Sequence, residues 1–310
     1  MTLRALHDVP APAKLNLFLH VVGRRDDGYH LLQSLFVLID WADRLSFERR
    51  DDGRLFRHDV AGSASVGLPA DDLCLRAARA LQAASGCPLG ADIHLDKRLP
   101  AGAGMGGGSS DAATTLLALN RLWTLNWPRA RLAAIALQLG ADVPFFIGGE
   151  NAFVEGIGER LTPVVVPPQT YAVVKPPTSI ETRAIFTHPL LRRDTEPVIL
   201  TGSFEGRWAA EGFGRNDLQP AAEDRCPEVA AAARWLEVRF GNSRMTGSGS
   251  AVFARVKTMD SCSGTAASPE AMSAPAAAPV FPAGLPAGWV GRMCKGLARH
   301  PLVHWAGRES

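Results

Sequence analysis

A glycine-rich stretch followed by two serines and an aspartate is the first feature of this sequence that could do chemistry. Residues 99–113 read LPAGAGMGGGSSDAA, with five glycines between Gly102 and Gly108, and an apolar helical pattern follows over residues 112–123. Glycine lets the backbone adopt positive φ and approach a ligand closely. A glycine loop that leads into a helix offers free N–H groups and the positive end of the helix dipole to an anion. The stretch therefore predicts a polyphosphate-binding loop, with Ser109 as the N-cap of the helix.

Two well-known phosphate-binding signatures fit this loop poorly. Gly102, Gly104 and Gly107 match the spacing of the dinucleotide fingerprint, but that fingerprint closes a buried strand and is followed by an acid about 20 residues later. Residues 92–99 alternate polar and apolar, as in a strand with one solvated face, and residues 112–141 contain no acid. A Walker loop needs Gly-Lys-Ser or Gly-Lys-Thr, which the stretch lacks. The remaining alternative is a flexible surface turn, which the run into an apolar helix disfavours.

Three further polar residues stand in predicted elements where their chemistry is unusual. Lys14 and Asn16 share one face of a strand predicted over residues 13–22, which places an ammonium beside an amide. The alternative is an edge strand with solvated polar side chains. Asp142 follows a predicted helix and is flanked by apolar residues, which makes it a candidate catalytic carboxylate. A capping or turn aspartate is the alternative there.

Tyr29 and His30 come directly after a predicted turn at residues 23–28 and lead into an apolar run. From spacing alone, a binding role and simple packing at the edge of the core are equally good interpretations. A second glycine turn, RMTGSGS at residues 244–250, precedes a predicted strand.

The remaining elements must position these residues. Apolar alternation predicts strands, and helical periodicity with start and stop signals predicts helices. The strands are expected at residues 13–22, 43–50, 92–99, 151–154, 161–166, 171–174, 251–256 and 289–297. The helices are expected from Asp71-Asp72 to near Gly86, and at residues 109–122, 129–139, 181–186 and 224–240. Residues 51–53 read as a hairpin turn. Residues 258–288 are rich in Ala, Ser, Pro and Gly, which predicts a flexible insertion.

Length and composition bound the class of protein. The chain has 310 residues, enough for one large or two medium domains, with 46% hydrophobic and 21% charged residues, as in a soluble enzyme. A net charge of +2 gives no argument for nucleic acid or a membrane surface. The five cysteines are scattered without a CxxC pair, which predicts reduced thiols in a cytoplasm rather than zinc or disulfides. We expect neither a signal peptide at residues 1–9 nor a membrane-spanning segment.

Three motifs together resemble the GHMP kinases: PAKLNL at residues 12–17, GGSSDA at residues 107–112 and TGSG at residues 246–249. The resemblance extends over about residues 10–256 and again around residues 295–302. Four runs are similar to the members of that family that phosphorylate a cytidine diphosphate-linked methylerythritol: residues 12–19, 27–30, 96–100 and 140–144. The alternatives that stay open are another GHMP kinase, acting on mevalonate or homoserine, and a non-catalytic sensor that binds ATP.

The resemblance implies an α+β fold of two domains with the active site in the cleft between them. Residues 1–160 would resemble the second domain of ribosomal protein S5, and residues 161–310 would be ferredoxin-like. The implied reaction moves the γ-phosphoryl group of ATP, with Mg²⁺, to the C2 hydroxyl of the methylerythritol in non-mevalonate isoprenoid synthesis. The implied protein is cytoplasmic, a monomer or weak homodimer, and binds a small-molecule substrate rather than nucleic acid or membrane.

The resemblance also implies a role for individual residues. Asp142 would take the proton of the attacking hydroxyl, Lys14 would lie beside it, and Ser110 would bind Mg²⁺. The residues implied to bind ATP are Lys97, Pro100, Ala101, Gly102, Ala103, Gly104, Met105, Gly106, Gly107, Gly108, Ser109 and Ser110. Asp72 stands where some relatives carry Asn against adenine, so it is left out of the site.

The substrate end would need stacking and hydrogen bonds. Tyr29 and Phe186 would cover the two faces of the cytosine, and His30 would bond its edge. The other residues implied to contact or enclose the substrate are Asn16, Thr182, Gly247 and Gly249.

Overall fold

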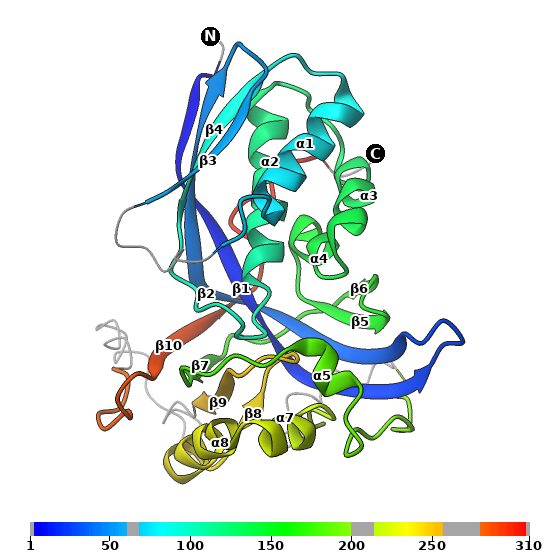
Figure 1. The fold of residues 1–310 in the computed structure, drawn as a ribbon, viewed down its shortest axis with the longest axis vertical. Helices are drawn as coiled ribbons and strands as arrows, with labels where there is room; N and C mark the ends of the chain where they lie inside the picture. The colour runs from blue at the N-terminus through cyan, green and yellow to red at the C-terminus, as the bar shows by residue number, and fades with distance from the viewer. Residues whose placement is uncertain (1–2, 61–67, 200–213, 257–279, 308–310) are drawn as a thin grey trace, which may run out of the picture.

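The computed structural model describes residues 3–60, 68–199, 214–256 and 280–307 (Figure 1). The described strands are β1 (Ala5–Arg24), β2 (His30–Arg50), β3 (Leu55–Asp59), β4 (Gly90–Asp96), β5 (Ala152–Gly156), β6 (Arg160–Pro163), β7 (Thr170–Lys175), β8 (Arg244–Met245), β9 (Val252–Val256) and β10 (Val290–Leu297). The described helices are α1 (Leu73–Ser85), α2 (Gly107–Leu122), α3 (Arg129–Leu139), α4 (Val143–Gly148), α5 (Thr182–Phe186), α7 (Gln219–Arg225) and α8 (Pro227–Phe240).

The strands form one hydrogen-bonded path centred on β2. The order is β3-β4-β2-β10-β7-β9-β8, and β1 and β5 also pair with β2. β10 touches β2 through only two residue pairs, Gly296 with Ile39 and Leu297 with Leu38, so the path turns there into a second layer made of β7, β9 and β8. Figure 1 shows the long strands β1 and β2 running from the upper layer down onto the lower one.

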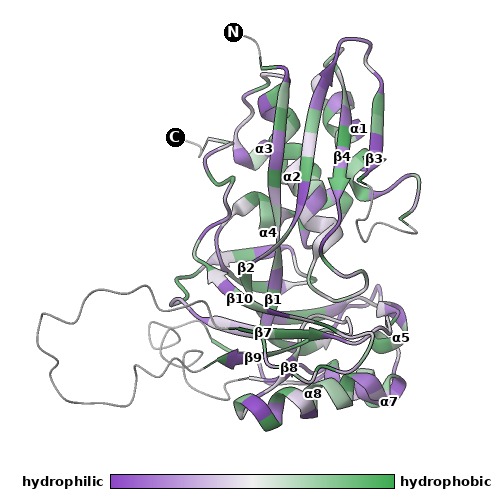
Figure 2. Cartoon of the chain, turned by 90° about the vertical axis from the view of Figure 1, so that its left-hand side faces the viewer, coloured by the Kyte–Doolittle hydropathy of each residue, from purple (hydrophilic) through white to green (hydrophobic). Residues whose placement is uncertain are grey.

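Helices cover each layer on one side, and the two groups of helices lie at opposite ends of the molecule (Figure 2). Helices α1 to α4 pack on the sheet around β2 and β4, where residues such as Leu45, Leu116 and Phe146 are fully buried. Helices α7 and α8 pack on β7 and β9, with Leu236 and Val252 in that core. The layered burial explains why the strand residues at these positions are apolar.

β1 is longer and less regular than the predicted strand. It is buried from Ala11 to Val21 without a break, because both of its faces are covered. Its register with β2 shifts between Pro12 and Lys14 and again between Asn16 and Leu19. A proline has no N–H for the ladder, and a bulge frees neighbouring N–H groups for other partners. The freed N–H groups of β1 point toward the candidate site.

The sequence predicted α1 well, and its start is confirmed. Asp72 is the N-cap, and its side chain accepts a hydrogen bond from the N–H of Leu75 at 3.1 Å. Gly86 ends the helix with φ +63°. Asp72 also pairs with Arg57 at 3.0 Å, so this acid serves the local fold.

The predicted hairpin turn at residues 51–53 is wrong. β3 does not pair back on β2 but lies parallel to β4, on the far side of it. The sequence signal for a turn was correct, but strand β4, which comes later in the chain, takes the place beside β2.

Four other expectations concern the domain division, the insertion, the cysteines and a membrane-spanning segment. The division at residue 160 stays a prediction, while Leu302 and Ala306 return to pack in the first core. Residues 258–279 of the predicted insertion lie outside the described residues, and residues 280–288 pack on α8, where Phe281 stacks on Trp235.

Cys74, Cys87, Cys226 and Cys294 are free. Among the described helices, none is long and apolar enough to cross a membrane.

Candidate active site

The two glycine turns predicted from the sequence lie backbone against backbone. Gly104 has φ +75°, and a Cβ on it would lie 2.3 Å from the carbonyl oxygen of Thr246. A Cβ on Gly249 would lie 2.0 Å from the N atom of Gly104. The N–H of Ala251 donates to the carbonyl of Ala103 at 3.2 Å. Glycine is required here because the two backbones approach more closely than any side chain allows.

This contact changes the interpretation of the second turn. Gly247 and Gly249 are expected to shape a wall of the substrate site, but they pack directly on the first loop. A Cβ on Gly247 would lie 2.6 Å from the carbonyl oxygen of Gly104. Asn216 holds the second turn in place, because its side-chain amide donates to the carbonyls of Met245 and Gly247, each at 2.8 Å. The second turn therefore supports the first glycine loop.

β1 is the element that joins both turns. The N–H of Lys14, freed by the bulge, donates to the carbonyl of Met105 in the first loop at 3.0 Å. The N–H of Asn16 donates to the hydroxyl of Thr246 in the second turn at 2.9 Å. One short stretch of strand thereby fixes the positions of both turns and of the side chains of Lys14 and Asn16.

The structure brings Lys14, Asn16 and Asp142 together. The Lys14 ammonium lies 2.5 Å from Oδ1 of Asn16 and 3.5 Å from Oδ2 of Asp142. Lys14 is buried, and burial lowers its pKa while Asp142 partly opposes the shift. The Asp142 side chain is 32% exposed. A buried cation therefore faces a carboxylate that solvent or a ligand can reach.

Asp142 stands at the N-cap position of α4, but its side chain makes no capping hydrogen bond. The alternative of a purely capping aspartate is therefore not supported by the geometry. Pro144 is the second residue of α4, where its fixed φ suits the first turn. The apolar residues Phe145, Phe146 and Ile147 anchor α4 in the core and hold the carboxylate at the surface.

Helix α2 begins two residues earlier than predicted, so Ser109 as its N-cap is wrong. The N-cap is Gly106, with φ +71°, and the helix begins at Gly107. A glycine in this left-handed conformation turns the chain without a capping side chain. The N–H groups of the first turn of α2 have no acceptor within the helix, as in any α-helix. They belong to Gly107, Gly108 and Ser109, which are at least partly exposed. They suit an anion.

Lys97 does not point toward a ligand. Its ammonium lies 2.5 Å from Oδ2 of Asp43 and 2.6 Å from Oδ2 of Asp111, and all three side chains are buried. Oδ1 of Asp43 accepts the N–H groups of Arg98 and Leu99 at 2.6 and 2.7 Å. This buried triad, Lys97 with Asp43 and Asp111, clamps the start of the loop to the N-terminal part of α2.

Burial also perturbs one acid of the triad, Asp111. It raises the pKa of Asp111 to about 8, because the nearby Lys97 only partly offsets the loss of water and Asp43 adds a second negative charge. The same two carboxylates raise the pKa of Lys97 although burial opposes them. Within the described residues, Oδ1 of Asp111 is buried without a hydrogen-bond partner.

The residues predicted for a pyrimidine base lie at the other end of the β1–β2 hairpin. The rings of His30 and Phe186 are 5.0 Å apart at 31°. Tyr29, which precedes His30 in the sequence, is 60% exposed, so its ring is accessible to a ligand rather than packed in the core. Thr182, at the start of α5, shares a hydrogen bond of 2.8 Å with Ser248, which ties α5 to the second glycine turn.

Sequence reasoning missed several residues that hold this arrangement. Asn216 supports the second turn, and Arg193 bonds His30. Asp43 lies within a strand, with no motif around it to mark its role. The feature that marks these residues is that they are polar and buried, and a single sequence does not show burial.

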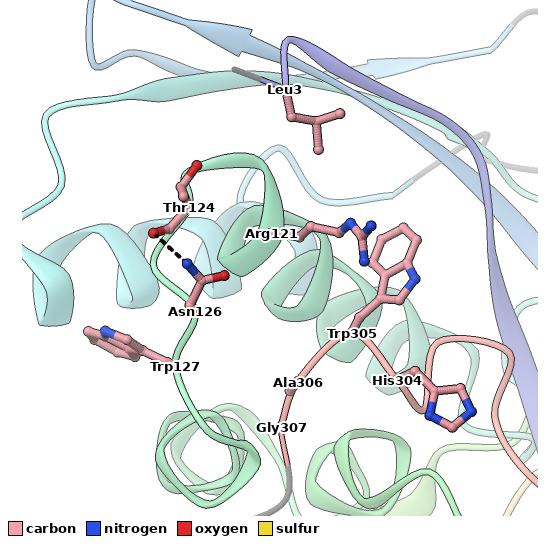
Figure 3. A pocket seen from close by; sticks show the side chains of 9 residues that line it. All are labelled: Leu3, Arg121, Thr124, Asn126, Trp127, His304, Trp305, Ala306 and Gly307. Atoms are coloured by element: carbon pink, nitrogen blue, oxygen red, sulfur yellow. Dashed lines mark hydrogen bonds between the residues drawn. The ribbon is translucent and has the colours of Figure 1, made fainter. Parts of the chain in front are cut away.

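A separate hollow of about 710 Å³ lies at the C-terminal end of α2, away from the glycine loop at its N-terminus (Figure 3). Arg121 lies with its guanidinium 5.2 Å from the centre of the Trp305 ring in this hollow. Leu3 and Trp127 also line it. None of the predicted site residues does, so the candidate active site is defined by the loop and its neighbours.

Comparison with known proteins shows the family of the chain. The GHMP kinases N terminal domain model matches residues 72–150, and the GHMP kinases C terminal model matches residues 206–261. A protein of Methylibium petroleiphilum named 4-diphosphocytidyl-2-C-methyl-D-erythritol kinase is 60% identical over 99% of this chain and 100% of its own length.

Solved structures extend the comparison. A crystal structure of 4-(cytidine 5'-diphospho)-2C-methyl-D-erythritol kinase has a TM-score of 0.67 at 38% identity, over 79% of this chain and 88% of that one. A homoserine kinase from Cytophaga hutchinsonii has a TM-score of 0.59 at 17% identity, over 83% and 86% of the two chains, which is a likeness of fold.

Proposed function

The chain belongs to the GHMP kinases, and from that premise we propose that it transfers the γ-phosphoryl group of ATP to the C2 hydroxyl of 4-diphosphocytidyl-2-C-methyl-D-erythritol. The products are ADP and the 2-phosphate, in the non-mevalonate route to isoprenoid precursors. The relative with 60% identity supports the choice of substrate. The observation that carries the chemistry is the buried Lys14 ammonium opposite the half-exposed Asp142 carboxylate, beside the glycine loop.

ATP would bind with its phosphates against the loop of residues 100–110. The first N–H groups of α2 and the positive end of its dipole favour the negative charge. The second glycine turn keeps the loop in place from behind. Lys97 contributes by holding the loop to α2 through Asp43 and Asp111, since its ammonium is already occupied by these two carboxylates.

Asp142 would accept the proton of the C2 hydroxyl while the hydroxyl oxygen forms its bond to the γ-phosphorus. The bond between that phosphorus and the oxygen bridging to ADP breaks in the same displacement. General-base assistance matters because a tertiary alcohol is a weak nucleophile until its proton is taken. Lys14 would offset the negative charge that develops, and phosphoryl transfer asks the protein mainly for such positioning and charge stabilisation.

Mg²⁺ would enter with the ATP phosphates and neutralise part of their charge. It prefers oxygen ligands and keeps several waters. The Ser110 side chain is fully buried in this structure, and its hydroxyl donates to the carbonyl of Pro12 at 2.7 Å, so a role as Mg²⁺ ligand would require its oxygen to become accessible. Across the described ranges, no three His, Cys, Asp or Glu side chains gather in a way that could hold a metal. No step is assigned to a metal held by this chain.

The cytidine end would bind near Tyr29, His30 and Phe186, with the ring of Tyr29 covering one face of the base. Thr182 and Asn16 would lie along the path from the base to the reacting hydroxyl. The support for this placement is that α5 is tied to the second glycine turn through Ser248. The active site would then occupy the cleft between the two domains.

We also propose that the enzyme acts in the cytoplasm as a monomer or weak homodimer, without nucleic acid. The net charge of +2 supports the absence of a nucleic-acid partner. Sedimentation of the purified protein with and without substrate tests the oligomeric state.

A coupled assay of ADP release tests the proposed function. The purified protein is given ATP with 4-diphosphocytidyl-2-C-methyl-D-erythritol, with mevalonate, or with homoserine. We expect turnover with the cytidine substrate alone, and its loss in Asp142→Ala. Turnover with another alcohol would identify a different GHMP kinase. ATP binding without turnover on any of the three would support the sensor instead.

A further inference from the structure

Arg193 joins His30 to Phe186 in the proposed base site. It lies beyond α5 in a segment without helix or strand, and its Nε donates to Nε2 of His30 at 3.1 Å. Its Nη2 donates to the carbonyls of Phe186 and His188 at 3.1 and 3.3 Å. Its Nη1 donates to the carbonyl of Leu191 at 3.1 Å. The guanidinium is held by several bonds at once, so its direction toward His30 is fixed by the fold.

This contact decides which nitrogen of His30 carries a proton. A guanidinium is always protonated and can only donate, so Nε2 of His30 must be the accepting, unprotonated nitrogen. A neutral imidazole then carries its proton on Nδ1. The charged groups that act on His30 are Arg193 and Arg24, both cationic, and together with burial they lower its pKa and keep the ring neutral.

The Nδ1–H group is available to a ligand. Within the described part of the chain it takes part in no hydrogen bond, while the ring itself is held against Phe186. Tyr29 beside it is largely exposed. A histidine fixed in this way presents one donor, in one direction, next to an aromatic surface.

A fixed donor distinguishes cytosine from uracil. The N3 atom of cytosine is an acceptor, whereas N3 of uracil carries a hydrogen and is a donor. A histidine free to change tautomer could present an acceptor to uracil and would lose this discrimination.

We propose that Arg193 is a positioning residue that holds His30 as the Nδ1–H tautomer and thereby makes the base site select cytosine over uracil. The inference rests on the proposed function, because it takes the cytosine of the substrate as the ligand of His30. Arg193 acts through His30 and through the backbone of Phe186.

The first test reads the tautomer directly. Two-bond ¹H–¹⁵N correlations of the histidine rings are recorded for the full-length protein, with His30→Gln to assign the signal. In the wild type we expect His30 protonated on Nδ1 and bare on Nε2. In Arg193→Met we expect a mixture of tautomers. A wild-type ring protonated on Nε2 would overturn the inference without any ligand present.

The second test reads selectivity, with CDP and UDP as probes in calorimetry. We expect the wild type to prefer CDP, and Arg193→Met to reduce the ratio of the two affinities about tenfold, the effect of about one hydrogen bond. Arg193→Lys keeps the charge without the planar fork, and we expect it to behave like Arg193→Met. Arg192→Met is the matched control, since Arg192 is exposed and bonds only Asp194 among the described residues.

The outcomes separate the inference from the proposed function. Arg193 variants that keep the CDP preference of the wild type, or an Arg193→Lys that restores it fully, would overturn the positioning role. A KM for ATP that rises as much as the KM for the cytidine substrate would mean that Arg193 only stabilises the fold. A wild type that does not phosphorylate the cytidine substrate would refute the proposed function and the selectivity derived from it, while the tautomer is still decided by the ring spectra.

Discussion

Replacing Gly104 by alanine should separate the two glycine turns. The added Cβ would lie 2.3 Å from the carbonyl oxygen of Thr246 and 2.7 Å from the N atom of Gly249, whereas ordinary contact begins at 3.4 Å. Both neighbours are backbone atoms, which no change of rotamer can move. The glycine loop and the second glycine turn must therefore move apart by about 1 Å, which is enough to misplace a catalytic group.

The size of the effect follows from that displacement. A misplacement of about 1 Å can cost about 10²-fold in rate, so we expect kcat/KM to fall by roughly that factor, mainly through the KM for ATP. The left-handed backbone adds about 1–2 kcal/mol of instability for any non-glycine residue. Gly86 provides the matched control, because its φ is +63° and a Cβ on it meets nothing within 4 Å. Gly86→Ala should show the backbone cost alone.

The coupled ADP-release assay with ATP varied, together with thermal unfolding of each variant, measures both quantities. If Gly104→Ala were as active as Gly86→Ala at equal folded fraction, contact between the two turns would not be what positions the phosphates. A loss of stability without a change in KM for ATP would lead to the same conclusion.

Four other predictions follow from the site. Asp142→Ala should lower kcat by ~10²–10⁴-fold and leave ATP affinity in calorimetry unchanged, because the carboxylate acts on the hydroxyl; a kcat near that of the wild type would remove the base from the mechanism. Tyr29→Ala should raise the KM for the cytidine substrate by about 5- to 150-fold, the value of one base stack, without affecting the KM for ATP; the reverse pattern in steady-state kinetics would mean that the two ends are exchanged. Lys97→Met should destabilise the fold by about 3–5 kcal/mol in urea unfolding, since it leaves the buried side chains of Asp43 and Asp111 without their cationic partner; a neutral result would contradict the clamp. Asp111 has a pKa of about 8 in the folded state and about 3.9 when unfolded, so the folded state holds the extra proton and the wild type should lose Tm relative to Asp111→Asn as pH rises toward about 8; parallel Tm curves for the two proteins would refute the raised pKa.

Local signals in the sequence were enough to predict part of this architecture. The helix of residues 129–139 has the predicted bounds, and Asp72 caps α1 as its type and position indicate. The glycine loop was predicted as an anion site because glycines before an apolar helix leave N–H groups free. These features depend on neighbours within a few residues, which one sequence displays.

The misses depend on residues far apart in the chain. Ser109 has the right type for an N-cap, but Gly106 takes that position, in a left-handed backbone conformation packed against the side chains of Phe146 and Lys14. The resemblance implies that Lys97 binds ATP, whereas in the structure its ammonium pairs with Asp111 and with Asp43, which is 54 residues away. Arg193 reaches His30 across 163 residues. Periodicity and composition carry no information about such contacts.

The hydrogen bond between Asn16 and Thr246 also sets the order in which this protein can mature on the ribosome. The two residues are 230 positions apart, so the support of the phosphate loop is synthesised long after the loop itself. Contacts of such long sequence separation form late and slow folding. A nascent chain that has emerged as far as α4 already contains Lys14, the glycine loop and Asp142, yet it lacks the turn that holds the loop in place. Nucleotide binding should therefore begin only after β9 has left the exit tunnel, and a partly synthesised chain should be unable to bind ATP.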